Sequence, residues 1–300
     1  MSGPRRLVVT LSCPDRVGIV ARLAGHLAAI GASITEAASY TDVEGRWFAS
    51  RHTVAAGDVP GGAEELRRGI AAIAAELATP VGPPVRWKVR DTGVPQRIVL
   101  LVSRESHCLH DLLGRVSGGE LDVEVGAVVG NHDVLRPMAE AHGVPFHHVP
   151  FPRAADDDAQ RSGRDAAFDR VAAIVDAQEP DAIVLARFMQ VLTPELCTRW
   201  AGRAINIHHS FLPSFAGARP YHQAYDRGVK LVGATCHYVT PDLDAGPIIE
   251  QDVSRVDHAD TVADMVRRGR DVEKLVLARG LRWHLEDRVQ VQGGRTVVFR

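Results

Sequence analysis

The N-terminal part of the chain alternates apolar runs with amphipathic segments. The apolar run 5–13 predicts a strand. Apolar side chains then recur at every third or fourth position over 15–31, which predicts an amphipathic helix. Asp15 has a side chain suited to the N-cap of this helix, and Gly31 stands where a helix often ends.

Two further strands and a second helix complete this pattern. Residues 33–56 alternate in polarity around Glu44 and Gly45, which predicts a β-hairpin that turns at this dipeptide. A second amphipathic helix is predicted over 63–81 and a last strand over 85–91. The resulting order β-α-β-β-α-β is that of the ferredoxin-like fold.

The pattern changes after a linker at 91–96. Strands are now apolar on both faces, as expected for a buried parallel sheet, and they alternate with helices. We therefore expect an α/β fold with an open, mostly parallel sheet, whose ligands bind beyond the carboxyl ends of the strands. The predicted strands are 96–103, 121–130, 144–150, 181–186, 203–209 and 231–239, and the predicted helices are 107–117, 133–143 and 164–180.

Length and composition fit a two-domain enzyme better than a binder of polyanions. The 300 residues have room for two domains, which we place at 1–91 and 92–300. The 35 Lys and Arg nearly balance the 37 Asp and Glu, which argues against nucleic acid or an anionic membrane as a partner. Four scattered cysteines without a CxxC pair, and the lack of a signal-peptide or membrane-spanning pattern, predict a cytoplasmic protein.

Two common kinds of site do not fit the motifs. The segment 103–108 after the first strand of the second domain has no glycine, which disfavours a dinucleotide-binding fingerprint or a P-loop. The histidines form no HExxH pair, and the neighbours His208 and His209 are expected on opposite faces of a strand. We therefore expect no metal and no nucleotide cofactor.

An acid–base site fits the same segment better. In the stretch "INIH" of the predicted strand 203–209, Asn206 and His208 share a face and are roughly 7 Å apart. An amide donor beside an imidazole suits a carbonyl that becomes an oxyanion. A carboxylate partner is available in Asp244, which precedes a tight turn at Gly246 and Pro247. Each residue alone is more often a loop anchor, but the set favours catalysis.

This set resembles the folate-dependent formyltransferase fold family. Within the family, the chain resembles the deformylases, which carry an ACT-like domain before the formyltransferase-like domain. The residues that carry the resemblance are Asn206, His208, Leu212, Pro213, Gly217, His222 and the run Leu243–Pro247.

The resemblance implies hydrolysis of 10-formyltetrahydrofolate to tetrahydrofolate and formate, without a cofactor. Asn206 would hold the formyl oxygen, His208 would stabilise the developing charge and protonate the leaving nitrogen, and Asp244 would activate the water. His209 would help arrange the water or only pack the loop. The other implied substrate contacts are Phe188, Met189, Gln190, Val191, Leu192, Gly217 and His222, where Phe188 replaces a tyrosine frequent in the family.

The resemblance also leaves alternatives open. The alternative activity is formyl transfer to an amine, although transformylases have a glycine-rich loop where this chain has "SRESHC". The N-terminal domain resembles an ACT domain through Asp15, Arg16 and Gly18, and such domains bind a small amino acid or serve only for dimerisation. The family implies a homo-oligomer, with a tetramer as its typical form, and a supply of formate for purine synthesis.

Overall fold

The computed structural model describes residues 4–152, 157–213 and 220–300. It divides into two compact units, and each is described by itself. The first unit comprises Met1–Pro95, Glu286–Gln292 and Val297–Arg300, and the second comprises Gln96–Leu285 and Gly293–Thr296. The roles predicted for 1–91 and 92–300 remain predictions. No helix among the described residues is long and apolar enough to cross a membrane.

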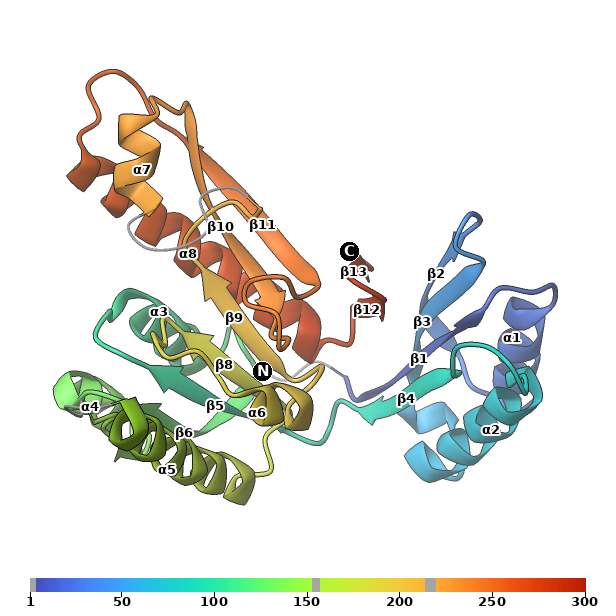
Figure 1. Cartoon of the computed structure of the whole chain (residues 1–300). Coiled ribbons are helices and arrows are strands. Elements are labelled where there is room, and N and C mark those ends of the chain that lie inside the picture. Colours follow the sequence, from blue (N-terminus) through green and yellow to red (C-terminus); the bar gives the residue numbers. More distant parts are fainter. Residues whose placement is uncertain (1–3, 153–156, 214–219) are drawn as a thin grey trace. The chain divides into compact units, whose positions relative to one another are not determined.

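The first unit contains a four-stranded antiparallel sheet in the order β2-β3-β1-β4 with two helices, as predicted (Figure 1). The apolar faces of the helices bury Leu23, Leu27, Leu66 and Ile70 in one core with Leu11 of the sheet. The elements are β1 Arg6–Pro14, α1 Ile19–Ala29, β2 Ile34–Asp42, β3 Trp47–Ala55, a 3-10 turn Ala56–Asp58, α2 Gly62–Leu77 and β4 Arg86–Asp91.

The predicted N-cap at Asp15 is wrong. Helix α1 begins at Ile19, and its N-cap is Gly18, whose φ of 92° lies in the left-handed region that favours glycine. The backbone N–H of Asp15 donates instead to the Arg46 carbonyl oxygen at 2.8 Å. The loop therefore turns into the helix through a glycine conformation and not through a capping side chain.

The second unit contains a seven-stranded sheet in the order β11-β10-β9-β8-β5-β6-β7. Strands β5 to β9 are parallel, and β10 and β11 are antiparallel, which confirms the mostly parallel α/β sheet. The strands are β5 Gln96–Val102, β6 Val123–Gly130, β7 Phe146–His148, β8 Ala182–Ala186, β9 Ala204–His208, β10 Leu231–Tyr238 and β11 Ile248–Arg255. The helices are α3 His107–Ser117, α4 Arg136–Ala141, α5 Asp157–Ala177, α6 Pro194–Arg199, α7 Pro220–Asp226 and α8 Val262–Leu285.

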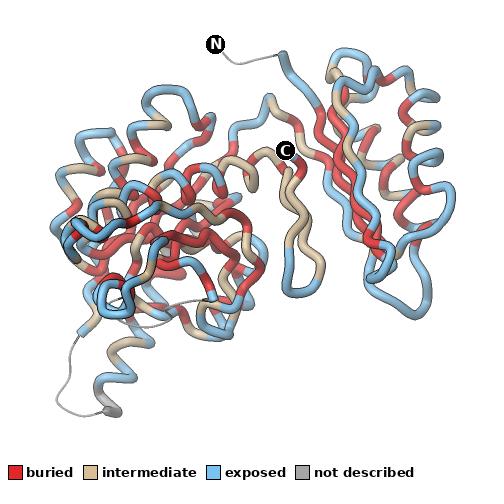
Figure 2. The backbone as a smooth tube through the Cα atoms, turned by 90° about the horizontal axis from the view of Figure 1, so that it is seen from above, coloured by how far each residue is buried: buried red, intermediate tan, exposed pale blue. Residues whose placement is uncertain are grey.

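Helices cover both faces of this sheet (Figure 1). Helices α5 and α6 bury Phe168, Val171 and Trp200 against the apolar strands on one face, and the long helix α8 packs along β9, β10 and β11 on the other. Figure 2 shows the buried backbone concentrated in the strands of each unit. The strand order reverses between β5 and β8, and open α/β sheets bind ligands at the carboxyl ends of the strands at such a switch point. The carboxyl end of β9 lies beside that of β8.

Three features differ from the sequence expectations. The helix predicted over 133–143 is a 3-10 turn, Asp133–Leu135, followed by α4, because Pro137 fits only the first turn of a helix. Helix α5 begins at Asp157, before the predicted start at 164. Strand β11, helices α6 and α8, and the C-terminal hairpin of β12 Val289–Gln292 and β13 Arg295–Val298 were not predicted.

Candidate active site

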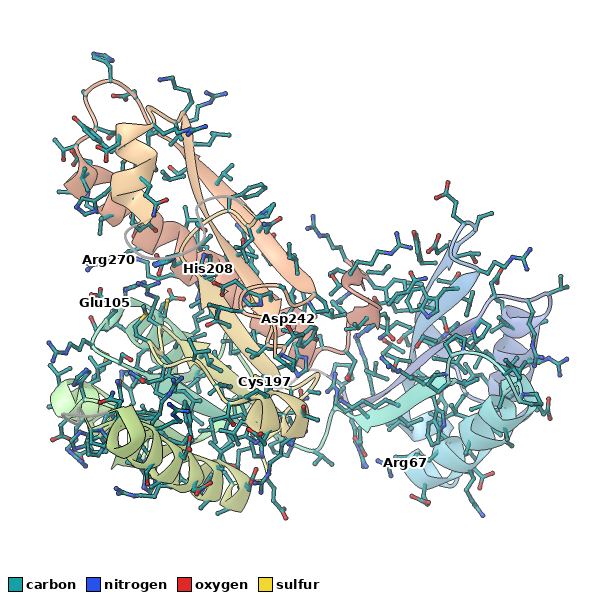
Figure 3. The ribbon with its side chains drawn as sticks, in the orientation of Figure 1. Arg67, Glu105, Cys197, His208, Asp242 and Arg270 are labelled. Atoms are coloured by element: carbon teal, nitrogen blue, oxygen red, sulfur yellow. The ribbon has the colours of Figure 1, made fainter. Side chains whose placement is uncertain are left out.

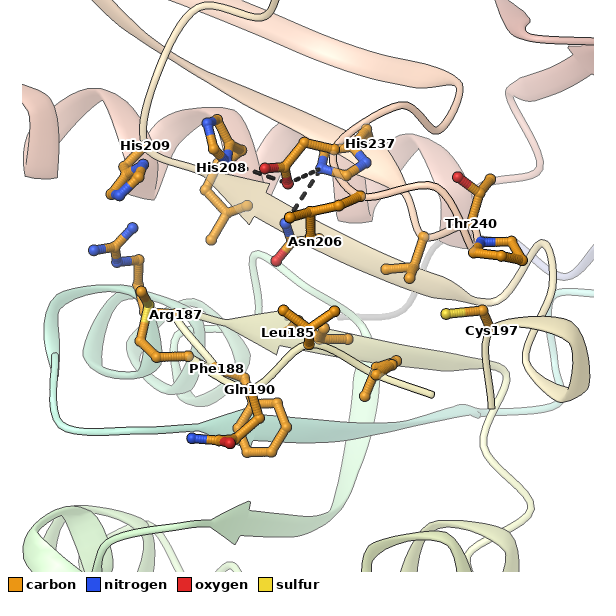
Figure 4. A pocket seen from close by; sticks show the side chains of 18 residues that line it. Leu185, Arg187, Phe188, Gln190, Cys197, Asn206, His208, His209, His237 and Thr240 are labelled. Atoms are coloured by element: carbon orange, nitrogen blue, oxygen red, sulfur yellow. Dashed lines mark hydrogen bonds and ion pairs between the residues drawn. The ribbon is translucent and has the colours of Figure 1, made fainter. Parts of the chain in front are cut away.

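The predicted residues Asn206 and His208 lie at the carboxyl end of β9. His208 is buried and is the last residue of the strand, and Asn206 is partly buried two positions before it. The antiparallel strand β10 places His237 directly opposite Asn206. Nδ2 of Asn206 lies 3.2 Å from Nε2 of His237, and Figure 4 shows the two side chains joined by this contact.

Asp244 comes from the loop between β10 and β11. Its Oδ1 lies 3.3 Å from Nδ1 of His208 and 3.8 Å from Nε2 of His237. Its φ of 55° is unusual for a residue other than glycine. A Cβ on Gly246 would lie 1.8 Å from the carbonyl oxygen of Tyr238, so only glycine allows the loop to approach β10 this closely. The predicted trio of Asn206, His208 and Asp244 is thus brought together.

The environment fixes the protonation of two of these groups. The hydrogen bond with His208 holds the pKa of Asp244 below its ordinary value, so the carboxylate is charged. Burial lowers the pKa of His237, which therefore stays neutral. The Nδ1 of His237 lies 2.9 Å from the carbonyl oxygen of Tyr238, which can only accept. Nε2 of His237 then accepts from Asn206, and one N–H of the Asn206 amide stays available for a ligand.

Sequence reasoning missed His237. It lies in the predicted strand 231–239, but nothing in the sequence assigns this strand as the antiparallel neighbour of β9. A usable signal was the matching alternation, since histidine at 237 and asparagine at 206 each occupy a polar position between apolar ones. The residue positions Asn206 through its neutral ring.

A cavity of about 420 Å³ opens beside these residues and is called the first cavity (Figure 4). Its polar end contains Asn206, His208, His237 and Asp244. Its other walls are mostly apolar, which suits a flat heteroaromatic ligand. The remaining lining residues are Leu185, Arg187, Phe188, Met189, Gln190, Val191, Leu192, Cys197, Ile207, His209, Val239, Thr240, Pro241 and Leu243.

The predicted contact segment after β8, residues 188–192, lies along this cavity. The Phe188 side chain is buried and packs edge-on against Phe151, with ring centroids 6.0 Å apart. The Met189 N–H donates to Ser103 Oγ at 2.8 Å, and the Val191 carbonyl accepts from Arg164 at 2.6 Å. These contacts hold the segment in place and leave fewer of its backbone groups free for a ligand than the sequence suggested.

Three other predicted residues lie in different places. His222 is exposed on α7 and lines a second cavity, described below, but not the first one. Gly217 lies outside the described residues. His209, expected to face away from His208, follows the last residue of β9, so strand alternation no longer applies there. Its ring meets the His208 ring edge-on with centroids 4.9 Å apart, and it lines the first cavity.

His209 is neutral at physiological pH. Burial is the main reason that its pKa is lowered to about 4, and the charge of Arg187 lowers it further. Because the His209 imidazole is neutral, it places no positive charge beside His208. Its ring can accept or donate one hydrogen bond, which suits contact with water or with a small polar ligand.

One group among the described residues has the spacing of metal ligands, and it lies outside this trio. It comprises His107, Cys108 and Glu273, all buried or nearly so. Glu273 already accepts from Tyr221 Oη at 2.9 Å and lies 2.8 Å from Nε2 of His107. Burial and the charge of Glu273 keep the pKa of Cys108 well above its ordinary value, so the thiol is neutral. Both Glu273 oxygens and one nitrogen of His107 are thus engaged by protein groups.

In the first unit, the residues predicted for an ACT-like site lie in the loop between β1 and α1. Gly18 caps α1, and its carbonyl accepts from the N–H of Arg22 at 3.0 Å. Arg16 donates to the Glu76 carbonyl oxygen at 2.6 Å, and Asp15 is exposed. An effector role for Asp15, Arg16 and Gly18 remains a prediction.

Comparison with known proteins shows the family to which the chain belongs. Residues 96–281 match the family model for formyl transferases. Over the full length of both proteins, the chain is 43% identical to a formyltetrahydrofolate deformylase of Escherichia coli and 40% identical to one of Corynebacterium sp.. The chain belongs to the formyltetrahydrofolate deformylase family.

The structure of this chain is more similar to solved deformylases than to a solved transformylase. A deformylase from Pseudomonas syringae pv. tomato has a TM-score of 0.93 at 50% identity and covers 99% of this chain and 95% of its own. One from Burkholderia mallei has a TM-score of 0.88 at 42% identity and covers 99% and 100%. A glycinamide ribonucleotide transformylase from Symbiobacterium toebii reaches a TM-score of 0.61 at 30% identity and covers 70% of this chain and 97% of its own.

Proposed function

We propose that this protein hydrolyses 10-formyltetrahydrofolate to tetrahydrofolate and formate, with water as the attacking group. The observation that carries the proposal is the ionised Asp244 at 3.3 Å from His208, beside a cavity whose apolar walls suit a pterin. Membership of the deformylase family supports the same substrate and the same reaction.

Asn206 and His208 would act on the formyl oxygen. Because His237 takes one N–H of the Asn206 amide, the other N–H can donate to the oxygen as it becomes negative. Nε2 of His208 is buried and has no hydrogen-bond partner among the described residues. With Nδ1 held by Asp244, a protonated His208 would donate through Nε2 and then pass that proton to the leaving nitrogen.

Asp244 would serve as the general base. One carboxylate oxygen holds His208, and the other can accept a proton from the attacking water. After the nitrogen leaves, Asp244 holds the proton of the water and His208 has given one away. Transfer of a proton from Asp244 to His208 across their contact then restores both groups, so the cycle needs neither a metal nor a covalent intermediate.

The test is formate release from 10-formyltetrahydrofolate with no amine added. A hydrolase releases formate at a rate that added amines do not raise. The alternative, formyl transfer to an amine, predicts little formate in either case, with tetrahydrofolate and a formylated amine produced only when an acceptor is present. Tetrahydrofolate production that depends on an acceptor, with the formyl group recovered on the amine, would refute the hydrolytic proposal and favour transfer.

For the first unit we propose an ACT-like regulatory domain that binds a small amino acid and mediates self-association. The proposal is supported by the antiparallel β2-β3-β1-β4 order and by the glycine conformation at Gly18. Calorimetric titration with glycine and with methionine, together with light scattering, tests ligand binding and the expected tetramer. No heat with any amino acid would leave dimerisation as the role of the unit. Cytoplasmic location and formate supply for purine synthesis remain predictions of the family.

A further inference from the structure

A second cavity of about 370 Å³ lies behind the catalytic residues in the same unit. Arg187 and His209 line both this cavity and the first one. Each follows the last residue of a parallel strand, β8 or β9, so the pair lies at the carboxyl edge of the sheet, next to the switch point between β5 and β8. Figure 4 shows the Arg187 side chain directed toward His209. The other lining residues are Glu105, His107, Tyr221, His222, Val266, Arg270 and Glu273.

The floor of the second cavity is a buried carboxylate with several donors. Glu273 is 1% exposed and is contacted by Tyr221, His107 and Arg187 at 2.9, 2.8 and 3.4 Å. Burial alone would raise the pKa of Glu273, but the hydrogen bond from His107 and the charge of Arg187 outweigh it and lower that pKa. At the rim, Arg270 pairs with Glu105 at 2.6 Å, and Figure 3 labels both side chains.

These pairings limit the charge of a ligand. The two arginines, Arg187 and Arg270, face two carboxylates, so the formal charge of the lining is zero when the histidines are neutral. Such a lining does not supply the surplus of cationic groups that a phosphorylated amine acceptor would need. A small monoanion or a neutral molecule suits it better.

Arg187 and His209, which line both cavities, nevertheless have unused hydrogen-bonding capacity. Nε of Arg187 is 3.4 Å from Glu273 but is not aligned to donate to it, and this nitrogen has no hydrogen-bond partner in the part of the chain that the structure describes. Nδ1 of His209 and Nδ1 of His107 are likewise buried, and neither has a partner within residues 4–152, 157–213 and 220–300. Buried donors and acceptors without a partner are costly, which favours a small polar ligand that lies near them and reorients them.

The reaction produces one ligand of this kind. We propose that the second cavity binds the product formate, a one-carbon carboxylate, between Arg187 and His209 while tetrahydrofolate still fills the first cavity. The inference rests on the proposed hydrolysis, since that reaction places formate at His208, and His209 is next to it.

The site is tested by NMR with ¹³C-formate and enzyme saturated with tetrahydrofolate. We expect the ¹³C signal of formate to broaden on binding, with a dissociation constant in the millimolar range, because a ligand of three non-hydrogen atoms cannot bind much more tightly. The broadening should be the same with and without tetrahydrofolate. Loss of the formate signal broadening on saturation with tetrahydrofolate would overturn the proposal, because the two products would then share one cavity.

A matched pair of variants locates the site. Val266 lines the second cavity, whereas Val262, one turn earlier on α8, packs against the same hydrophobic cluster and lines neither cavity. Val266→Trp should weaken formate binding at least about tenfold, and Val262→Trp should leave it unchanged at a similar Tm. Equal effects of the two substitutions on formate binding would overturn the proposed location of the formate site.

A second variant keeps the test open if Val266→Trp does not fold. Arg187→Met should weaken formate binding about tenfold, because the guanidinium that would pair with the carboxylate is lost. Unchanged formate binding would overturn the role of Arg187. These measurements need no turnover, so a failure of the formate site is distinguishable from a failure of hydrolysis, which is seen as no formate release without an acceptor.

Discussion

Nδ2 of Asn206 lies 3.2 Å from Nε2 of His237, directly across the antiparallel pair of β9 and β10. The contact orients an amide that would otherwise rotate, because His237 is held neutral by burial and its Nδ1 donates to Tyr238. The reacting trio therefore depends on a fourth residue that touches no substrate in the proposed mechanism. His237 is a positioning residue.

The first prediction concerns this contact. His237→Leu removes the acceptor, so we expect kcat to fall by about 10- to 100-fold while KM changes little, since the amide acts mainly on the oxyanion. His237→Gln retains an acceptor and should recover much of the rate. Steady-state kinetics and Tm of both variants check this. Equal losses of rate and of Tm in the two variants would show that His237 has only a structural role.

The second prediction concerns the general base. Asp244→Asn keeps the shape of the side chain but cannot accept the proton of the water, so turnover should fall by about 10²- to 10⁴-fold. Tetrahydrofolate binding, measured by fluorescence or calorimetry, should remain. The control is Asp242→Asn, an exposed residue of the same loop, which should retain activity. Loss of folate binding in Asp244→Asn would make Asp244 a structural residue.

The third prediction concerns pH. The hydrogen bond with His208 is the main reason that the pKa of Asp244 is below its ordinary value of 3.8. The base therefore remains ionised as the pH falls to 3.8, and activity lost above that pH comes from another group. In His208→Asn the main cause is gone, so the pKa of Asp244 should rise. Carboxyl ¹³C NMR titration checks this, and an unchanged or lower midpoint would contradict it.

The fourth prediction concerns the loop that carries Asp244. A Cβ on Gly246 would lie 1.8 Å from the Tyr238 carbonyl oxygen, so Gly246→Ala should destabilise the fold by about 1–3 kcal/mol and displace Asp244. Thermal unfolding and activity are the measurements. The control Gly114→Ala, at an exposed helix position with no atom within 4 Å, should be neutral or stabilising by about 0.5–1 kcal/mol. Full activity with an unchanged Tm in Gly246→Ala would contradict the close approach.

Local patterns were sufficient where a short segment determines its own structure. The strand ending at His208 could be predicted from its alternation, and the β-hairpin in the first unit from its turn residues. Asn206, His208 and Asp244 could be proposed as a catalytic trio because asparagine, histidine and aspartate occur in a recognisable order. The distances between these three residues could not be predicted, because β9 and the loop with Asp244 meet only through the pairing of β10 with both of its neighbours.

Most of the missed features depend on contacts distant in sequence. His237 gains its role only from a register between two strands. The cap of α1 was missed for a local reason, because the backbone turns at Gly18, and not at Asp15, in the left-handed region. Helix α8 was missed although its inner face is apolar. Its buried Glu273 interrupts the apolar pattern and is satisfied by His107 and Tyr221 from other elements.

The central claim is that water, and not an amine, takes the formyl group. The most direct test is turnover of 10-formyltetrahydrofolate in ¹⁸O-enriched water with no acceptor present, followed by mass analysis of the formate. The proposed mechanism predicts prompt formate release with one oxygen atom from the solvent in each molecule. No formate without an amine, with the formyl group recovered on the amine once one is added, or formate that contains no solvent oxygen from the first turnover, would contradict it.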